Sequence, residues 1–292
     1  MPISVKSLHP VLAAQVTGVD LREALDDPTV TAISDAINQH GVLVFPAQFI
    51  TDAQQMAFSR RFGELETTVK IYRKDYVPRL DPHISDVSNL DQDNQIRRKD
   101  DRLRLNALGN RLWHSDSSFK RVPARFSLLS ARHIPSEGGE TQFADMRAAW
   151  DALPERMKAR LEGLICEHTQ LFSRAKIAFT DWSEEERVKM APVPQVLVRT
   201  HPGSHRKSLF LSSHAGRIRG MEEPEARVLL MDLMEHATQR EFVYTHRWTV
   251  GDLVMWDNRC TMHRAREYDD EQVRDMHRTT VSDGVPTVAE AA

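Results

Sequence analysis

The chain has 292 residues, of which 40% are hydrophobic and 28% are charged, a composition typical of a folded globular protein. Its 39 basic and 42 acidic residues nearly cancel, so the sequence offers no broad field that would attract nucleic acid or an anionic membrane. No apolar run reaches the roughly 20 residues of a membrane span, the first residues lack a secretory signal, and only two cysteines are present, so we expect a cytoplasmic protein without a disulfide framework.

The sequence shows no internal repeat, no low-complexity tract and no linker, so we expect a single domain over residues 1–292. Two helix starts are predicted where capping-box patterns occur, at Thr51-x-x-Gln54 and at Ser183-x-x-Glu186. A longer helix is predicted over residues 222–239. Its apolar side would consist of Val228, Leu229, Met231, Leu233 and Met234.

Short runs rich in aliphatic and aromatic residues are typical of strands, and they dominate the rest of the chain. They occur at residues 41–45, 126–130, 196–199, 208–211, 241–244, 252–256 and 277–281. Many short strands, with helices before and between them, predict a mainly β fold with helices around a jelly-roll core.

Residues 75–110 interrupt this pattern of apolar runs. Residues 97–104 in particular are polar and of mixed charge, which is typical of a solvated surface loop. A long loop directly before a metal motif can also act as an active-site lid, and that alternative stays open at this point.

The most informative segment is Trp113-His-Ser-Asp116. Side chains at i and i+2 of a strand point to the same face, so His114 and Asp116 could occupy adjacent positions on one metal ion. Alone the pair is weak evidence, because a chain with 13 histidines can contain it by chance. Two imidazoles and one carboxylate that leave three positions open form the ligand set of non-haem Fe(II) oxygenases, so a second histidine is needed from elsewhere.

A second informative segment contains His263, which follows a predicted strand and a turn, and two arginines beyond it. Arg274 and Arg278 come 11 and 15 residues after His263. If this stretch is a strand, both arginines lie on one face with their guanidinium groups on the order of 13 Å apart. That separation suits two different anions held at two places in one cavity.

Several segments, spread nearly end to end, resemble the taurine/2,4-dichlorophenoxyacetate dioxygenase family, and within it the branch that acts on 2,4-dichlorophenoxyacetate. The matching segments are Asp20-Leu-Arg-Glu-Ala-Leu25, Trp113-His-Ser-Asp-Ser-Ser-Phe119, Gly138-Gly-Glu-Thr141, Asp145-Met-Arg-Ala-Ala149, Val198-Arg-Thr-His201 and the block of residues 235–259. The last block is the most specific. The resemblance implies a double-stranded β-helix, which is a jelly roll.

The resemblance also implies a set of site residues. Iron would be held by His114, Asp116 and His263. A Thr and an Arg bind the distal carboxylate of 2-oxoglutarate in the family, and they match Thr141 and Arg274 here. A further Arg, matching Arg278, would hold the anionic group of the main substrate. The other candidate substrate contacts are Asn110, Ser117, His214 and Lys70.

Structural roles remain open for three of these residues. Thr141 could serve only as a hydrogen-bonding residue of a strand, and Arg278 could be a salt-bridge partner inside the barrel. His214 could be a histidine with one ordinary hydrogen bond and no ligand.

The reaction implied by the family consumes 2-oxoglutarate and O2 at Fe(II) and yields succinate and CO2. A small anionic aromatic substrate would be hydroxylated at the carbon beside its ether oxygen and would separate into a phenol and a 2-oxo acid such as glyoxylate. The family also implies a homo-oligomer. Three other functions remain possible: oxidation of an alkylsulfonate or of another small carboxylate, a zinc site that is hydrolytic or structural, and a metal-free interaction protein.

Overall fold

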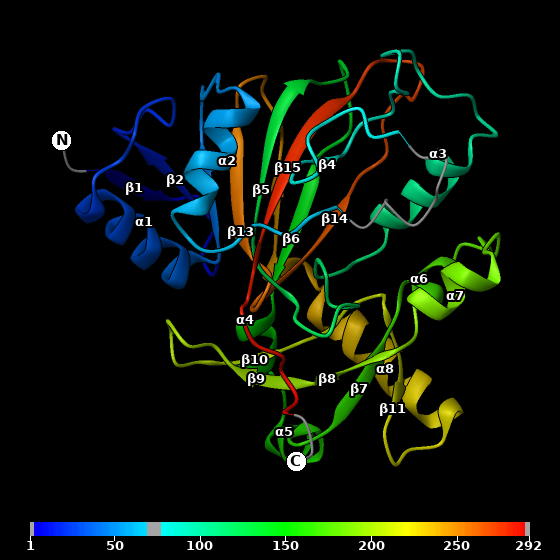
Figure 1. The fold of residues 1–292 in the computed structure, drawn as a ribbon. Helices are drawn as coiled ribbons and strands as arrows, with labels where there is room; N and C mark the ends of the chain where they lie inside the picture. Colours follow the sequence, from blue (N-terminus) through cyan, green and yellow to red (C-terminus); the bar gives the residue numbers. More distant parts are fainter. Residues whose placement is uncertain (1–2, 69–76, 290–292) are drawn as a thin grey trace.

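The computed structural model describes residues 3–68 and 77–289, and its core consists of two facing β-sheets with helices outside them (Figure 1). The helices are α1 (Asp27–His40), α2 (Asp52–Arg60), α3 (Arg102–Ala107), α4 (Met146–Asp151), α5 (Glu155–Leu161), α6 (Gln170–Ala175), α7 (Glu184–Lys189) and α8 (Glu223–Ala237). Two short 3-10 helices are η2 (Leu108–Arg111) and η3 (Arg240–Phe242).

The larger sheet has seven strands and the smaller one three. The spatial order of the larger sheet is β1 (Ser4–Ser7), β2 (Ala14–Thr17), β3 (Val42–Phe45), β13 (Leu253–Asp257), β5 (Ala124–His133), β15 (Asp275–Ser282) and β4 (Ser85–Asp86). The smaller sheet consists of β12 (Val243–His246), β6 (Thr141–Asp145) and β14 (Thr261–Ala265). All neighbouring strands in both sheets are antiparallel except β2 and β3. This arrangement is the predicted jelly-roll core.

Apolar side chains from both sheets meet between them and hold them together. Phe143 of β6 packs in one cluster with Trp256 of β13, Leu129 of β5 and Met276 of β15, and all four are buried. Residues paired directly across neighbouring strands share a face of the sheet. His263 pairs with Phe143 and Arg278 pairs with Leu129, so these polar residues face the interior between the sheets, where the candidate site lies.

Helices α1 and α2 cover the outer face of the larger sheet. Helix α1 was not among the predicted helices, although its signals are present in the sequence. Asp26 accepts a hydrogen bond from the Thr29 amide at the first turn, and Gly41 ends the helix with a φ of 69°. The predicted capping box of Thr51 and Gln54 is confirmed at the start of α2.

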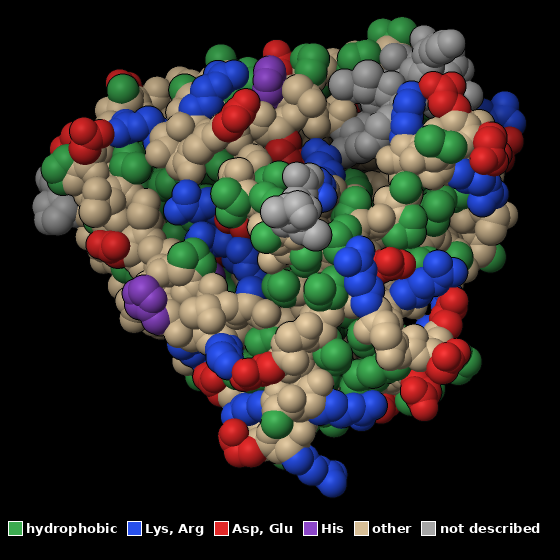
Figure 2. All heavy atoms as spheres, turned by 60° about the horizontal axis from the view of Figure 1, so that its bottom comes forward, with side chains coloured by type: hydrophobic (Ala, Val, Ile, Leu, Met, Phe, Trp, Pro, Cys, Tyr) green, Lys and Arg blue, Asp and Glu red, His purple; other side chains and the backbone are tan. Residues whose placement is uncertain are grey.

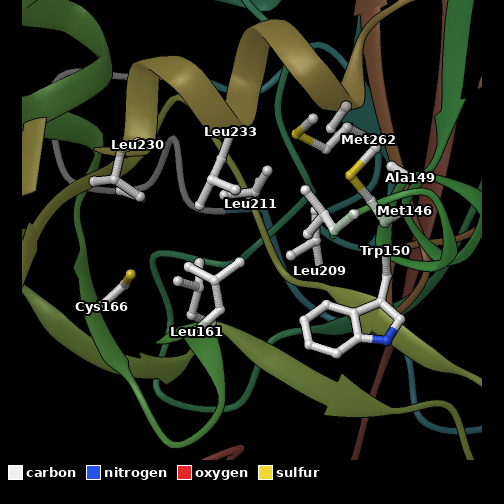
Figure 3. Packing of buried hydrophobic residues seen from close by; sticks show 14 of the residues in the cluster. Met146, Ala149, Trp150, Leu161, Cys166, Leu209, Leu211, Leu230, Leu233 and Met262 are labelled. Atoms are coloured by element: carbon white, nitrogen blue, oxygen red, sulfur yellow. The ribbon is translucent and has the colours of Figure 1, made fainter. Parts of the chain in front are cut away.

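Outside the two sheets lies a second layer, made of α8, α4 and the short sheets of β7 (Ile165–His168), β8 (Val193–Val196), β9 (Val198–Thr200), β10 (Lys207–Leu209) and β11 (Ala215–Ile218). Figure 3 shows Leu230 and Leu233 of α8 pointing toward Leu211 and Leu161. The predicted apolar side of this helix was partly wrong, because Val228 and Met231 are exposed. The buried side is Ala226, Leu229, Leu230, Leu233 and Ala237, which follows the helical period more closely.

Two predicted strands are displaced in the structure. The run at residues 196–199 is divided between β8 and β9, with fully buried Leu197 between them. The run at residues 241–244 begins as η3 and becomes β12 only at Val243. In both places one buried side chain, Leu197 or Phe242, lies where the regular strand is interrupted. An apolar run in the sequence does not reveal such an interruption.

Residues 77–110 are more than a solvated loop. They contain β4, α3 and η2, and Leu103, Asn106 and Leu108 from this stretch line the main cavity. Three of their arginines are paired with carboxylates elsewhere in the chain: Arg79 with Asp275, Arg104 with Asp270, and Arg102 with Glu186 at 2.9 Å. The segment therefore forms a wall of the cavity and is linked to α7 by the ion pair of Arg102 and Glu186.

No helix within residues 3–68 and 77–289 is long and apolar enough to cross a membrane. On the face shown in Figure 2, Lys and Arg side chains lie interspersed with Asp and Glu side chains. That face therefore presents no large area of one charge, as the balanced composition predicted.

One ion pair links α2 to β15 and makes stability depend on pH. His277 Nδ1 lies 2.6 Å from Asp52 Oδ1, and its Nε2 lies 3.3 Å from Asp275 Oδ1. Burial alone would lower the pKa of His277, but the hydrogen bonds to Asp275 and Asp52 outweigh burial and raise it. A histidine whose folded-state pKa is raised stabilises the fold below about pH 6.5, its unfolded value, and this contribution is lost as the pH rises through the folded-state pKa.

We therefore expect His277→Gln to lower the melting temperature more at pH 5.5 than at pH 8.5. The extra destabilisation should be about 1 kcal/mol, or roughly 2 °C. Thermal unfolding at both pH values measures it, with His83→Gln as a control that removes an exposed His–Asp pair. Equal losses of melting temperature at the two pH values would show that the charge on His277 does not contribute.

Candidate metal centre

Three buried side chains converge between the sheets: His114, Asp116 and His263. One ligand atom from each lies within 4.8 Å of the other two. His114 Nε2 is 3.8 Å from Asp116 Oδ1, and His263 Nε2 is 3.7 Å from Asp116 Oδ2. These separations are too long for hydrogen bonds and leave room for an ion that all three residues would share.

The backbone brings the two histidines together. His263 lies at the centre of β14, and His114 joins that strand by an isolated antiparallel bridge, with amide-to-carbonyl distances of 3.0 Å and 2.8 Å between the two residues. Asp116 does not continue a strand, contrary to the prediction, because the chain turns there and Ser117 has a φ of 52°. The i and i+2 side chains still face one site, since the turn carries the carboxylate back toward β5.

Hydrogen bonds fix the orientation of Asp116. Its backbone amide donates to Asn258 Oδ1 at 3.0 Å, and Ser127 Oγ of β5 donates to its Oδ2 at 2.7 Å. Arg278 Nη1 of β15 donates to its Oδ1 at 2.6 Å. Such outer partners are common around metal ligands, because they fix the ligand and tune its basicity.

The protonation states match the needs of a metal site. Burial lowers the pKa of His114 and holds that of His263 well below its usual range, so both imidazoles are neutral at pH 7. Burial would raise the pKa of Asp116, but the Arg278 guanidinium, helped by the hydrogen bond from Ser127, outweighs burial and holds the pKa far below its usual range. Neutral histidine and charged carboxylate are the forms that bind metal ions.

His114 is also fixed as a ligand through its second nitrogen. Its Nδ1 lies 2.7 Å from the carbonyl oxygen of Leu112, so Nδ1 carries the proton and Nε2 presents a lone pair to the site. A second group of potential ligands, His201, Asp257 and Cys260, contrasts with this arrangement. There the carboxylate already accepts from Arg259 at 2.6 Å and lies 2.9 Å from the imidazole, so that group is a closed polar cluster.

Arg274 lines the same cavity as two of the three candidate ligands, His114 and Asp116. It is 5% exposed, and its Nη1 donates to the Val87 carbonyl at 3.2 Å while its guanidinium lies 5.6 Å from the Tyr268 ring centre. Burial lowers its pKa. Among the described residues no carboxylate forms an ion pair with Arg274, so this charged group has an anion still to bind.

Thr141 is linked to the surroundings of that arginine through Trp248. Its Oγ1 accepts from Trp248 Nε1 at 3.0 Å, and this bond leaves the hydroxyl proton available for another acceptor. Trp248 and Arg274 share the wall of a second cavity with Gly139. A Cβ on Gly139 would lie 3.5 Å from Arg274 Nε, so the turn before Thr141 passes directly beside the guanidinium.

The remaining residues that the sequence predicts as substrate contacts are Asn110, Ser117, His214 and Lys70. Asn110, Ser117 and His214 line the main cavity. Ser117 Oγ donates to Glu66 Oε2 at 2.7 Å, and His214 Nδ1 lies 2.9 Å from Ser173 Oγ. Lys70 lies outside the described residues.

The sequence reasoning missed Ser127, Asn258 and Arg174. Ser127 and Asn258 support Asp116 from positions 11 and 142 residues away. Arg174 lines the cavity from α6. A serine within an apolar strand is the one available signal, since Ser127 interrupts the predicted core run at residues 126–130.

A family described as "Taurine catabolism dioxygenase TauD, TfdA family" matches residues 4–280. The chain is 47% identical over 284 residues to the alpha-ketoglutarate-dependent 2,4-dichlorophenoxyacetate dioxygenase of Cupriavidus pinatubonensis, covering 97% of this chain and 99% of that one. It is 37% identical to the (S)-phenoxypropionate/alpha-ketoglutarate dioxygenase of Sphingobium herbicidovorans, covering 94% and 93%. Alpha-ketoglutarate is another name for 2-oxoglutarate.

Among solved structures, the crystal structure of AAD-2 in complex with Mn(II) and N-oxalylglycine has a TM-score of 0.92 and 51% sequence identity. It covers 99% of this chain and 100% of that chain. The predictions of the jelly-roll fold and of an alpha-ketoglutarate-dependent dioxygenase are thus confirmed. The chain belongs to the TauD, TfdA dioxygenase family.

Proposed function

We propose that this protein uses Fe(II), alpha-ketoglutarate and O2 to hydroxylate an aryloxyalkanoate such as 2,4-dichlorophenoxyacetate at the carbon next to the ether oxygen. The product separates into a phenol and a 2-oxo acid such as glyoxylate, while alpha-ketoglutarate yields succinate and CO2. The observation that carries the proposal is a buried His–Asp–His group of which His114 and Asp116 line one cavity, together with Arg274, a buried arginine with no described carboxylate partner. The 47% identity to a 2,4-dichlorophenoxyacetate dioxygenase supports the substrate class.

In this proposal His114, Asp116 and His263 hold the iron. When bound, the iron would supply the activation of O2 that is coupled to decarboxylation of alpha-ketoglutarate. Arg278 keeps the Asp116 carboxylate charged and oriented through the bond at 2.6 Å. Ser127 holds the second oxygen of that carboxylate. The chain's part in the reaction is therefore placement, and no side chain need act as a nucleophile or general base.

Arg274 and Thr141 bind the distal carboxylate of alpha-ketoglutarate. A guanidinium offers two parallel donors to a carboxylate, and the Thr141 hydroxyl adds a third. Because Arg274 is buried, this ion pair forms away from water and is strengthened accordingly. The Gly138–Gly139 turn allows the backbone to pass close to Arg274.

The substrate would lie in the main cavity, beside the metal ligands. Arg278 lines this cavity, and its donors beyond the one to Asp116 can face the substrate anion. Asn110, Ser117 and His214 are the other proposed contacts in the described part of the wall. We also propose that the chain works as one domain, in the cytoplasm, and as a homo-oligomer.

The proposal is tested by incubating the purified protein with Fe(II), ascorbate, O2 and alpha-ketoglutarate, and measuring succinate. We expect succinate to rise when 2,4-dichlorophenoxyacetate is added, with an equal amount of the phenol released. Taurine serves as the parallel sample. Stimulation by taurine alone would keep the enzyme class and reject the aryloxyalkanoate substrate.

Arg274→Gln should raise the KM for alpha-ketoglutarate by about 10- to 100-fold, because it removes a charge-assisted pair in a buried place. The Kd for the aryloxyalkanoate, measured with saturating N-oxalylglycine present, should change by much less. Initial-rate kinetics with each ligand varied in turn measures the first effect, and calorimetry the second. Arg266→Gln is the matched control, since Arg266 lines the same cavity but is exposed to solvent. An unchanged KM for alpha-ketoglutarate would assign Arg274 another role.

A further inference from the structure

Trp256 is a tryptophan of β13 that lies beside the proposed metal ligands and is only 1% exposed. It pairs directly across the larger sheet with Ser127 of β5, so both side chains point from that sheet into the interior. In the smaller sheet His263 pairs with Phe143 in the same way, and the Phe143 ring packs against that of Trp256. Trp256 therefore extends from one sheet to the metal ligand of the other.

The ring of Trp256 packs against the imidazole of His263. The two ring centres are 4.7 Å apart with 53° between the planes, and Phe143 stacks on His263 at 6.1 Å and 26°. His114 is fixed by the bond from its Nδ1 to the Leu112 carbonyl, but within the described chain Nδ1 of His263 has no hydrogen-bond partner. The orientation of His263 therefore depends on the rings around it.

The indole N–H of Trp256 reaches a second ligand, Asp116, through Asn258. Trp256 Nε1 donates to Asn258 Oδ1 at 3.1 Å, and the backbone amide of Asp116 donates to the same oxygen at 3.0 Å. Both groups can only donate, so they fix which way the Asn258 amide points. Its Nδ2 then donates to Ser127 Oγ at 2.9 Å, and the Ser127 hydroxyl is left to donate to Asp116 Oδ2 at 2.7 Å.

Every member of this network is buried, from Trp256 through Asn258 and Ser127 to Asp116. A buried polar network is strong only when each member has its partners, because a lost donor is not replaced by water. Tryptophan is the side chain that combines a large flat ring with a single N–H donor. Phenylalanine could supply the contact with His263 but could not hold Asn258.

We infer that Trp256 is a positioning residue for two metal ligands at once. Its ring orients His263, and its N–H orients Asp116 through Asn258 and Ser127. This inference rests on the proposed function, in which those two residues and His114 hold the iron. A single change at Trp256 therefore disturbs two of the three ligands.

The test measures binding of Mn(II) alone by calorimetry, on the full chain after its metal has been removed with a chelator and the chelator dialysed away. Trp256→Phe keeps a ring beside His263 and removes the N–H, so the Kd for Mn(II) should rise by about 10-fold. Trp256→Leu removes the ring as well, and the Kd should rise by about 100-fold. The electron paramagnetic resonance spectrum of the bound Mn(II) should change in both variants, because the ligands are displaced.

Trp150→Phe is the matched control. Trp150 is also buried, but it packs among aliphatic side chains of the second layer (Figure 3). Both substitutions by phenylalanine should lower the melting temperature of the metal-free protein, since each removes part of a buried ring. Trp150→Phe should nevertheless leave the Kd for Mn(II) within about threefold of the wild type.

Asn258→Ala breaks the connection to Asp116 at its other end and leaves the Trp256 ring in place. It should also raise the Kd for Mn(II) by about 10-fold, and it keeps the test open if Trp256→Phe does not fold. In the Asn258→Ala background, Trp256→Phe should add less than about threefold, because its N–H has already lost its acceptor. A normal Kd in Asn258→Ala, or independent effects of the two changes, would overturn the route from Trp256 to Asp116.

The inference as a whole fails if Trp256→Phe binds Mn(II) as tightly as the wild type, or if Trp256→Phe and Trp150→Phe weaken it equally. Equal losses in Trp256→Phe and Trp256→Leu would reject the role of the ring beside His263. Failure of the proposed metal centre gives a different result, because His263→Ala would then bind Mn(II) like the wild type. Loss of Mn(II) in His263→Ala with normal binding in Trp256→Phe would reject only the role of Trp256.

Discussion

Replacing His263 by Ala should abolish succinate formation and remove nearly all bound metal. The substitution deletes one of three ligands, and the remaining His114 and Asp116 can then hold only two positions of the ion. Loss of an outer partner of a metal ligand already costs about 10- to 100-fold in affinity or activity, so loss of a ligand should cost more than about 100-fold. Metal analysis after dialysis against Fe(II) or Mn(II), together with the succinate assay, measures both effects.

Two controls separate loss of metal from loss of fold. The His263→Ala protein should melt close to the wild type in the presence of a chelator, where neither holds metal. His236→Ala removes a histidine that binds only the Ala149 carbonyl, at 2.8 Å, and should retain full metal content. Stoichiometric metal in His263→Ala, or normal succinate formation, would show that the ion is held elsewhere.

Ser127 belongs to a buried hydrogen-bond network that holds Asp116 in place. Its hydroxyl donates to Asp116 and in turn accepts from Asn258 Nδ2 at 2.9 Å, so it is a link in a buried network. A buried network of this kind is hard to foresee from sequence, because its members lie on β5, on the turn after β13 and at the Asp116 turn. The motif predicts which residues face the metal, and the tertiary structure determines what holds them there.

Prediction from the sequence worked best where the signal is local. The apolar runs that became β5, β13 and β15 were found, because strand preference and burial agree there. The capping boxes of α2 and α7 were also found, since the box is a pattern of four residues. Helix α1 was not predicted, although its N-terminal cap at Asp26 and the glycine that ends it, Gly41, are also local signals.

The pairing of charges could not be predicted. Arg274, Arg278 and Arg174 are all arginines of one cavity, and nothing in their immediate sequence says which of them meets a carboxylate. Arg278 meets Asp116 from 162 residues away. Only the tertiary fold brings Arg278 of β15 and the turn that contains Asp116 together.

Removing one partner of the buried ion pair of Asp145 and Arg147 should destabilise the fold far more than breaking an exposed ion pair. Both side chains are fully buried, with a separation of 2.8 Å. Asp145 Oδ1 also accepts from the backbone amides of Arg147 and Ala148 at the start of α4. Arg147 in addition donates to the carbonyl of Asn38, in the last turn of α1, at 2.8 Å. The Arg147 side chain thus binds a free carbonyl at the end of α1 and links that helix to the start of α4.

Arg147→Met should therefore destabilise the protein by about 3–5 kcal/mol, because it leaves the Asp145 charge buried and unpaired. The corresponding drop in melting temperature is roughly 10 °C. Asp145→Asn combined with Arg147→Met should lose less than the sum of the two single changes, since the double variant leaves no charge unmatched. Arg227→Met breaks an exposed pair with Glu223 on α8 and should cost only about 0.5 kcal/mol. Equal melting temperatures for Arg147→Met and Arg227→Met would mean that the cavity and backbone around Arg147 relax enough to solvate Asp145, and that the link between α1 and α4 is dispensable.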